Sequence, residues 1–284
     1  MKKIAIIYEK SKKIGSGHYF RSLRLKDLLK NKFIISLFNI KNKKEINDIL
    51  KKKFDLNIFD LKTYPKFKSK KKIITFENLK KDTLNIVNIN PLDLHLKNSG
   101  PEFFTFPKNI NKVKLPINYI SKKRINILII QGGNDSNNQL QKLINFLEKN
   151  KREVKFNFRL MIKVLTKKNI KFNKPTFLID SIKNINKLYE KTDIAISSVG
   201  NTSFELGYIG IPTIHFTIEK REKKRAQILE KLKLASFIKK DFSQIIYELN
   251  RIYFNNNYRK NLIIRRIKFF KKKNKLVKII SNEI

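Results

Sequence analysis

Short apolar runs alternate with segments of helical periodicity in the first part of the chain. Four of these runs, each bounded by polar residues, have the length and composition of buried parallel strands. They are 4–8, 33–38, 56–60 and 73–76. Between them, 19–30 and 43–53 carry apolar residues at helical spacing. This alternation predicts a parallel sheet with helices on both faces.

A second series of the same kind follows. Its expected strands are 125–130, 176–179, 194–197 and 212–216, and its expected helices include 140–147 and 226–234. Pro116 and the polar run 121–124 separate the two series, so we expect two Rossmann-like, doubly wound α/β domains, 1–118 and 119–284. Open sheets of this type bind ligands at the carboxyl ends of their strands, which predicts a cleft between the domains.

The large net positive charge of the chain does not by itself indicate a nucleic-acid partner. There are 65 basic and 23 acidic residues, a net charge of +42, but 54 of the basic residues are lysine and only 11 are arginine. Lysine lacks the planar fork that reads phosphate and guanine. The aromatic residues follow apolar strand and helix patterns and do not interleave with basic ones, so nucleic acid is disfavoured as a partner.

The end of the chain, 258–284, is a basic segment of helical pattern. Leu262, Ile263, Ile267 and Phe270 can share one face of it. Such a helix either packs across the two domains or associates weakly with an anionic membrane surface.

Several classes of protein are excluded by composition. Cysteine is absent, which excludes disulfides, thiolate zinc sites and cysteine nucleophiles, and only three histidines are present. The apolar start is too short for a signal peptide, and no run approaches the roughly 18 residues of a membrane span. We therefore expect a soluble cytoplasmic protein.

The first candidate motif is Gly15-Ser16-Gly17-His18-Tyr19-Phe20-Arg21, after the first expected strand and at the start of the first helix. The glycines allow a sharp turn and a close approach to a ligand, and a helix amino terminus favours an anion. An unperturbed histidine titrates near pH 6.5, so His18 is a candidate for proton transfer. The third glycine of the dinucleotide fingerprint is missing. A histidine that only caps the helix is the alternative.

Two more loops follow strands of the second series. Gln131-Gly132-Gly133-Asn134 is a candidate phosphate or sugar loop, or a plain turn between strand and helix. In 198–205, Ser198, Gly200, Asn201 and Thr202 surround an expected helix start, with Glu205 expected in its first turn. That helix start could hold a diphosphate while Glu205 accepts hydrogen bonds from ribose; the alternative is a capping box in which Glu205 reaches back to the backbone.

These motifs together resemble the UDP-sugar hydrolase of the pseudaminic-acid pathway and the related spore-coat-polysaccharide-type nucleotide-sugar enzymes. The resemblance covers about 4–238. It rests on the G-x-G-H-x-x-R block, the turn at Gly100-Pro101, the Gly132-Gly133 loop and the block from Glu205 to Pro212. It implies the two-domain GT-B fold.

The resemblance also implies an activity: hydrolysis of a UDP-linked 2,4-diacetamido-2,4,6-trideoxyhexose, with His18 activating the water and with no cofactor or metal. It places Gly15, Gly17 and Arg21 at the substrate. Asp60 and Tyr64 stand near the family's Asp-x-Tyr on the sugar side, although Tyr64 comes two positions late. The family's Asn-Gln pair is replaced by Arg221-Glu222.

Two other functions stay open. One is a GT-B glycosyltransferase that passes the sugar of a UDP-sugar to a surface polysaccharide or glycolipid acceptor, which would suit a basic surface. The other is a nucleic-acid-binding protein that uses the +42 charge. The sequence does not fix the sugar stereochemistry, the acceptor or the oligomeric state.

Overall fold

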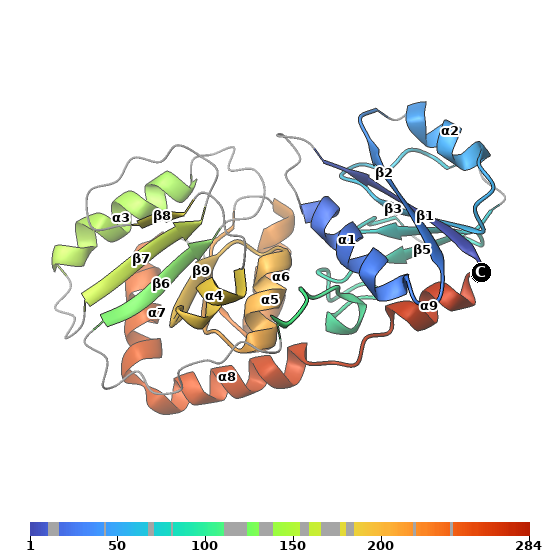
Figure 1. Cartoon of the computed structure of the whole chain (residues 1–284). Helices are drawn as coiled ribbons and strands as arrows, with labels where there is room; N and C mark the ends of the chain where they lie inside the picture. The colour runs from blue at the N-terminus through green and yellow to red at the C-terminus, as the bar shows by residue number, and fades with distance from the viewer. Residues whose placement is uncertain are drawn as a thin grey trace. The chain divides into compact units, whose positions relative to one another are not determined.

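The computed structural model describes most of the chain (Figure 1). The described residues are 1–10, 17–42, 44–67, 71–80, 82–110, 124–130, 139–153, 159–165, 177–179, 185–217, 220–238 and 241–284. The chain divides into two compact units, which are Met1–Lys108 together with Lys272–Ile284, and Asn109–Lys271.

The first unit is built on a five-stranded sheet in the order β2-β1-β3-β4-β5. Its strands are β1 (Lys3–Glu9), β2 (Ile34–Ile40), β3 (Leu56–Asp60), β4 (Ile73–Phe76) and β5 (Ile86–Ile89). Its helices are α1 (Gly17–Leu29), α2 (Lys44–Lys51), the 3₁₀ turn η1 (Pro101–Phe103) and α9 (Leu276–Asn282). All neighbouring strands in the sheet are parallel, as the alternating pattern predicts.

Apolar side chains on both faces of this sheet explain why its strands read as unbroken apolar runs. Ile4 and Ile6 of β1 pack in one cluster with Leu25 of α1 and Leu276 of α9. Ile7 of β1 lies in another cluster, on the face that α2 covers.

The second unit has a six-stranded sheet in the order β11-β10-β9-β6-β7-β8. Its strands are β6 (Arg124–Ile130), β7 (Arg159–Leu165), β8 (Phe177–Ile179), β9 (Ile194–Ser197), β10 (Thr213–His215) and β11 (Ser236–Phe237). Its helices are α3 (Gln139–Glu153), α4 (Ile185–Glu190), α5 (Asn201–Ile209), α6 (Lys220–Lys231), α7 (Ser243–Phe254) and α8 (Asn256–Phe270). All its strand pairs are parallel, so the prediction of two doubly wound α/β sheets is confirmed.

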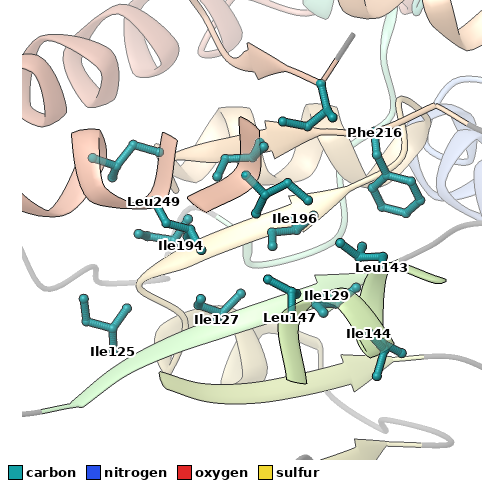
Figure 2. Close-up of a cluster of buried hydrophobic side chains, with 14 of the residues drawn as sticks. Ile125, Ile127, Ile129, Leu143, Ile144, Leu147, Ile194, Ile196, Phe216 and Leu249 are labelled. Atoms are coloured by element: carbon teal, nitrogen blue, oxygen red, sulfur yellow. The ribbon is translucent and has the colours of Figure 1, made fainter. Parts of the chain in front are cut away.

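Helices α3 and α7 contribute to one core cluster with β6 and β9 (Figure 2). Alternate residues of β6, namely Ile125, Ile127 and Ile129, meet Leu143 and Leu147 of α3 there, and all five are almost completely buried. Every second side chain of the strand points to the same face, and every third or fourth side chain of the helix does so, which brings these apolar residues together.

The basic C-terminal segment forms two helices, not one. Helix α8 packs along α5 in the second unit. After a break at 271–275, α9 buries Leu276 and Ile280 in the core of the first unit, although the sequence analysis placed these residues in the second domain. The Gly100-Pro101 turn takes part in this docking, because the Lys275 N–H donates to the Glu102 carbonyl at 2.7 Å and Asn274 donates to the Phe104 carbonyl at 2.9 Å.

Helix α5 approaches α8 closely at Gly207. A Cβ atom at this position would lie 2.3 Å from the Phe270 ring, which is itself buried and packs edge-on against Phe204. Gly210 ends α5 in the left-handed conformation, with φ of 87°, and lies against Ile267. Close packing therefore requires glycine at 207. At 210, glycine is required both by close packing and by the left-handed backbone conformation.

We expect Gly207→Ala to lower the free energy of unfolding by about 1–3 kcal/mol, because the added methyl overpacks a core that has no room for it. Urea titration followed by circular dichroism measures this. Gly200→Ala is the matched control, since a Cβ there has no heavy atom within 4 Å. An equal loss in both variants would contradict the close-packing argument.

Candidate active site

The first sheet changes its direction of winding between β1 and β3, which are neighbours in the sheet but are connected outward to opposite sides. Helix α1 follows β1, and Asp60 is the last residue of β3. The register pairs Tyr8 with Asp60, so both strands end at the same level. The start of α1 and the end of β3 therefore meet at the edge where doubly wound sheets bind ligands.

Two side chains converge there on one carboxylate. His18 Nδ1 lies 2.6 Å from Asp60 Oδ1, and Arg21 donates from Nε to Asp60 Oδ2 at 2.6 Å and from its terminal nitrogen to Oδ1 at 2.5 Å. His18 and Arg21 are three residues apart, which puts them on one face of α1. The spacing of the H-x-x-R motif thus brings a histidine and an arginine to the same acid.

Burial and charge keep this acid ionised. The side chains of Arg21 and Asp60 are 4% and 2% exposed. Burial alone would raise the pKa of Asp60, but the charges of Arg21 and then His18 outweigh it and hold the pKa at about 2. Burial alone would lower the pKa of Arg21, but Asp60 and then Glu77 raise it above its usual value.

Because an ionised carboxylate only accepts hydrogen bonds, Asp60 places the His18 proton on Nδ1. The other ring nitrogen, Nε2, is then an acceptor, and no described residue forms a hydrogen bond with it. The His18 side chain is 18% exposed, so part of the ring is accessible to solvent. This arrangement can take a proton from a bound molecule at Nε2.

Tyr64 has a different place from the one expected at the substrate. Its hydroxyl accepts from the Leu61 N–H at 3.0 Å and lies within hydrogen-bond distance of the carbonyls of Phe59, at 3.1 Å, and Phe76. Burial, followed by the charge of Asp60, raises the pKa of the phenol well above 10. The Tyr64 hydroxyl therefore links the carboxyl ends of β3 and β4 by hydrogen bonds to their backbone.

Glu77 also belongs to this group. It follows β4 directly, adopts a positive φ of 60°, and its carboxylate lies 3.4 Å from a terminal nitrogen of Arg21. A positive φ is uncommon for a residue with a side chain.

The second sheet reverses its winding between β6 and β9, and Ile130 pairs with Ser197 at the ends of these strands. In the sequence, the glycine loop follows β6 and the serine loop follows β9. Gly132, Gly133 and Asn134 lie outside the described residues, as does Gly15 of the first unit.

Helix α5 starts at this edge. Gly200 is its N-cap residue and no side chain caps it, so the capping box that the sequence left open as an alternative does not form. Asn201 and Thr202 are the first residues of the helix and are partly exposed, whereas Ser198 is buried. The free N–H groups of this first turn can bind an anion.

Glu205 lies in the second turn of α5, so its expected place in the first turn is wrong. The helix begins at Asn201, where the sequence predicts its start, and Glu205 is therefore its fifth residue. The Glu205 side chain is buried and accepts a hydrogen bond of 2.7 Å from the Tyr189 hydroxyl of α4.

His215 was assigned no role from sequence, yet it ends β10 beside this edge. It is completely buried, and its Nδ1 lies 3.2 Å from the Ser197 carbonyl and 3.3 Å from the Ser197 hydroxyl. Burial, followed by the charge of Arg266, lowers its pKa to about 3. His215 is therefore neutral at physiological pH and supports the end of β9.

Among the described residues, no three histidine, aspartate or glutamate side chains gather as a metal site would require. In the same part of the chain, no helix has the length and hydropathy needed to cross a bilayer.

The Asp60 carboxylate should make stability depend on pH. Its pKa is lowered on folding from 3.8 to about 2, so its stabilising contribution is complete above pH 5 and is lost as the pH falls toward 2. We expect the free energy of unfolding of the natural chain to fall by roughly 1 kcal/mol more than that of Asp60→Asn between pH 5 and pH 3. Urea titrations at both pH values measure this, and parallel loss in the two proteins would contradict it.

No protein-family model matches the sequence, and no curated protein matches it either. Solved structures do match over nearly the whole chain. The glycosyltransferase SnogD from Streptomyces nogalater has a TM-score of 0.65 at 10% identity, over 100% of this chain and 99% of that one.

Two further matches are a UDP-GlcNAc 2-epimerase from Neisseria meningitidis bound to UDP-GlcNAc and the S. aureus MnaA–UDP co-structure. The first has a TM-score of 0.62 at 13% identity, over 99% of this chain and 98% of that one. The second has a TM-score of 0.64 at 11% identity, over 99% and 95%. This chain thus has the GT-B fold of two Rossmann-like units that glycosyltransferases and UDP-GlcNAc 2-epimerases share.

Proposed function

We propose that this chain is a nucleotide-sugar enzyme that hydrolyses a UDP-linked sugar to the free sugar and UDP. His18 is the general base. A water oxygen bonds to the anomeric carbon, the bond from that carbon to the phosphate oxygen breaks, and its electron pair leaves with UDP. The proton that the water loses goes to His18 Nε2.

The observation that carries this proposal is the contact between His18 and Asp60. A buried carboxylate at 2.6 Å from Nδ1 fixes the ring and leaves Nε2 as an acceptor without a hydrogen-bond partner among the described residues. An imidazole held in this way presents Nε2 as a proton acceptor to a bound molecule, whereas Asp60 itself, with a pKa of about 2, is too weak a base.

In this proposal the second unit binds UDP. The uncapped start of α5 offers N–H groups to the diphosphate, with Ser198, Gly200, Asn201 and Thr202 around it. Glu205 accepts hydrogen bonds from the ribose. Gly15, Gly17, Gly132, Gly133 and Asn134 complete the substrate-binding set. The Neisseria meningitidis and S. aureus neighbours, whose structures hold UDP-GlcNAc and UDP, support a uridine nucleotide.

The sugar follows from the sequence resemblance, which points to a diacetamido-trideoxyhexose of the pseudaminic-acid type. A second candidate is transfer of the sugar to a hydroxyl acceptor, with His18 taking the acceptor's proton instead of water's. The glycosyltransferases among the structural neighbours favour it.

A panel of UDP-sugars tests both candidates. The protein is incubated with each sugar nucleotide in ¹⁸O-labelled water, with and without glycan and glycolipid acceptors, and products are identified by NMR and mass spectrometry. Hydrolysis with attack at carbon places ¹⁸O on the free sugar and none on UDP. UDP release that requires an acceptor would favour transfer, and a sugar nucleotide changed only in stereochemistry would indicate an epimerase.

We expect His18→Gln to lower turnover by about 100- to 10,000-fold, because glutamine can orient a water but cannot take its proton. Calorimetry should show UDP affinity within about twofold of the natural chain. His95→Gln is the control, since that exposed histidine lies outside the group at Asp60. Near-normal turnover of the His18 variant would remove it as the base.

We expect Glu205→Ala to weaken UDP binding by about 1.5–3 kcal/mol, the usual loss for a hydrogen bond to a charged group. Tyr189→Phe separates this role from packing, because it removes the hydroxyl that Glu205 accepts from and leaves the carboxylate in place. Calorimetry with UDP should show a loss in the first variant and little change in the second. If both weaken binding equally, Glu205 only supports the helix.

A further inference from the structure

Arg21 binds the carboxylate that contacts the proposed base, and its surroundings are those of an internal support. Its side chain is 4% exposed, and both oxygens of Asp60 receive hydrogen bonds from it. Glu77 lies on its other side at 3.4 Å, and its guanidinium carbon lies 5.4 Å from the centre of the Phe76 ring. Two carboxylates and an aromatic ring therefore surround the guanidinium.

We propose that Arg21 is a positioning residue for the reaction and does not bind the substrate: it holds Asp60 in the one orientation that fixes the tautomer of His18. This inference rests on the proposed function and changes the role that the sequence resemblance gave to Arg21.

Geometry shows why the fork of arginine is needed. Asp60 Oδ1 serves both His18 Nδ1 and a terminal nitrogen of Arg21, while Oδ2 is bound by Arg21 Nε. Two parallel hydrogen bonds stop the carboxylate from rotating about its Cβ–Cγ bond. Oδ1 thereby stays in line with the imidazole. Lysine would keep the positive charge but would supply a single point contact, which leaves this rotation free.

Glu77 extends the support by one step. It is the first residue after β4, and its backbone N–H donates to the Ile89 carbonyl at 2.9 Å, which ties it to the end of β5. Its positive φ of 60° directs the chain sharply at this point. A chain of contacts then runs from Glu77 to Arg21, from Arg21 to Asp60 and from Asp60 to His18. It connects the ends of β4 and β3 with the first turn of α1.

The closing experiment compares Arg21→Lys, Asp60→Asn and the double variant. We expect Arg21→Lys to lower kcat by about 10- to 100-fold, as is typical for residues that orient a functional side chain, with KM and UDP affinity within about twofold. In the Asp60→Asn background the same change should lower kcat by less than twofold, because Arg21 acts through Asp60. Arg24→Lys is the matched control, since Arg24 lies on the same helix and donates to the Thr105 carbonyl at 3.3 Å.

A raised KM with unchanged kcat in Arg21→Lys, or full additivity in the double variant, would overturn the proposal in favour of substrate contact.

A spectroscopic measurement needs no substrate and so separates this inference from the proposed function. With ¹⁵N-labelled histidine, the chain has only three imidazoles, and His18 is assigned from the His18→Gln spectrum. We expect the neutral His18 ring to carry its proton on Nδ1 in the natural chain and in Arg24→Lys. Arg21→Lys should show a mixture of both tautomers. A pure Nδ1–H tautomer in Arg21→Lys would refute the inference even if turnover had fallen.

If Arg21→Lys does not fold, Glu77→Gln tests the same order of contacts. It removes the charge on the outer side of Arg21 and leaves the hydrogen bonds to Asp60 in place. A smaller loss of kcat than that of Asp60→Asn, with UDP affinity unchanged, is expected. A loss of UDP affinity would place Glu77 and Arg21 at the ligand and overturn the proposal.

Discussion

The buried ion pair between Arg21 and Asp60 is the interaction on which the candidate active site of the first unit depends. An isolated carboxylate in this position would have to bind a proton, because burial disfavours its charged form. Arg21 reverses that preference and holds the pKa of Asp60 at about 2. Removing one member of such a pair leaves an uncompensated buried charge, which typically costs about 3–5 kcal/mol. Loss of either partner would therefore destabilise the fold, and Asp60 is also the residue that His18 contacts through Nδ1.

In the second unit, the feature that needs support is the start of helix α5, which has no side-chain cap. An uncapped first turn leaves N–H groups without partners in the protein and needs the rest of the helix to be held firmly. The far half of α5 is held by close packing on α8, where Gly207 admits the Phe270 ring. Ser197 and His215 support the strand that leads into the helix, and the low pKa of His215 keeps that support neutral. Packing at one end of α5 therefore holds a helix whose other end has no side-chain cap.

The C-terminal segment shows how a strongly basic sequence is still governed by its apolar positions. Arg259 and Arg266 of α8 are buried, and their guanidinium groups donate to carbonyls at helix and strand ends instead of facing solvent. Arg259 binds the last carbonyls of α7, where a positive charge is favoured by the helix dipole. Charge counted from composition therefore overstates the basic surface, since some of it completes hydrogen bonds inside the fold.

The sequence by itself determined the two series of strands and helices, because strands buried on both faces are continuous apolar runs and their helices keep an apolar stripe. It located β3, β4 and β9 to the residue. It missed three strands: β5, where asparagines interrupt the run, the seven-residue β7, and β11, which is only two residues long and exists through pairing with β10. It also singled out His18 as a candidate, because histidine is rare in this chain and glycines precede it.

Only the tertiary structure decided what surrounds that histidine. Asp60 and Glu77 come from strands that are distant in sequence, and nothing local indicates that Arg21 turns inward to them and not outward to a ligand. The same holds for the placement of α9 in the first unit, for the bond from Tyr189 to Glu205 and for the support that His215 gives β9. A side chain's hydrogen-bond partner depends on which strand ends the sheet order brings together. That order is a property of the whole chain, whereas strand and helix periodicity is a property of each segment.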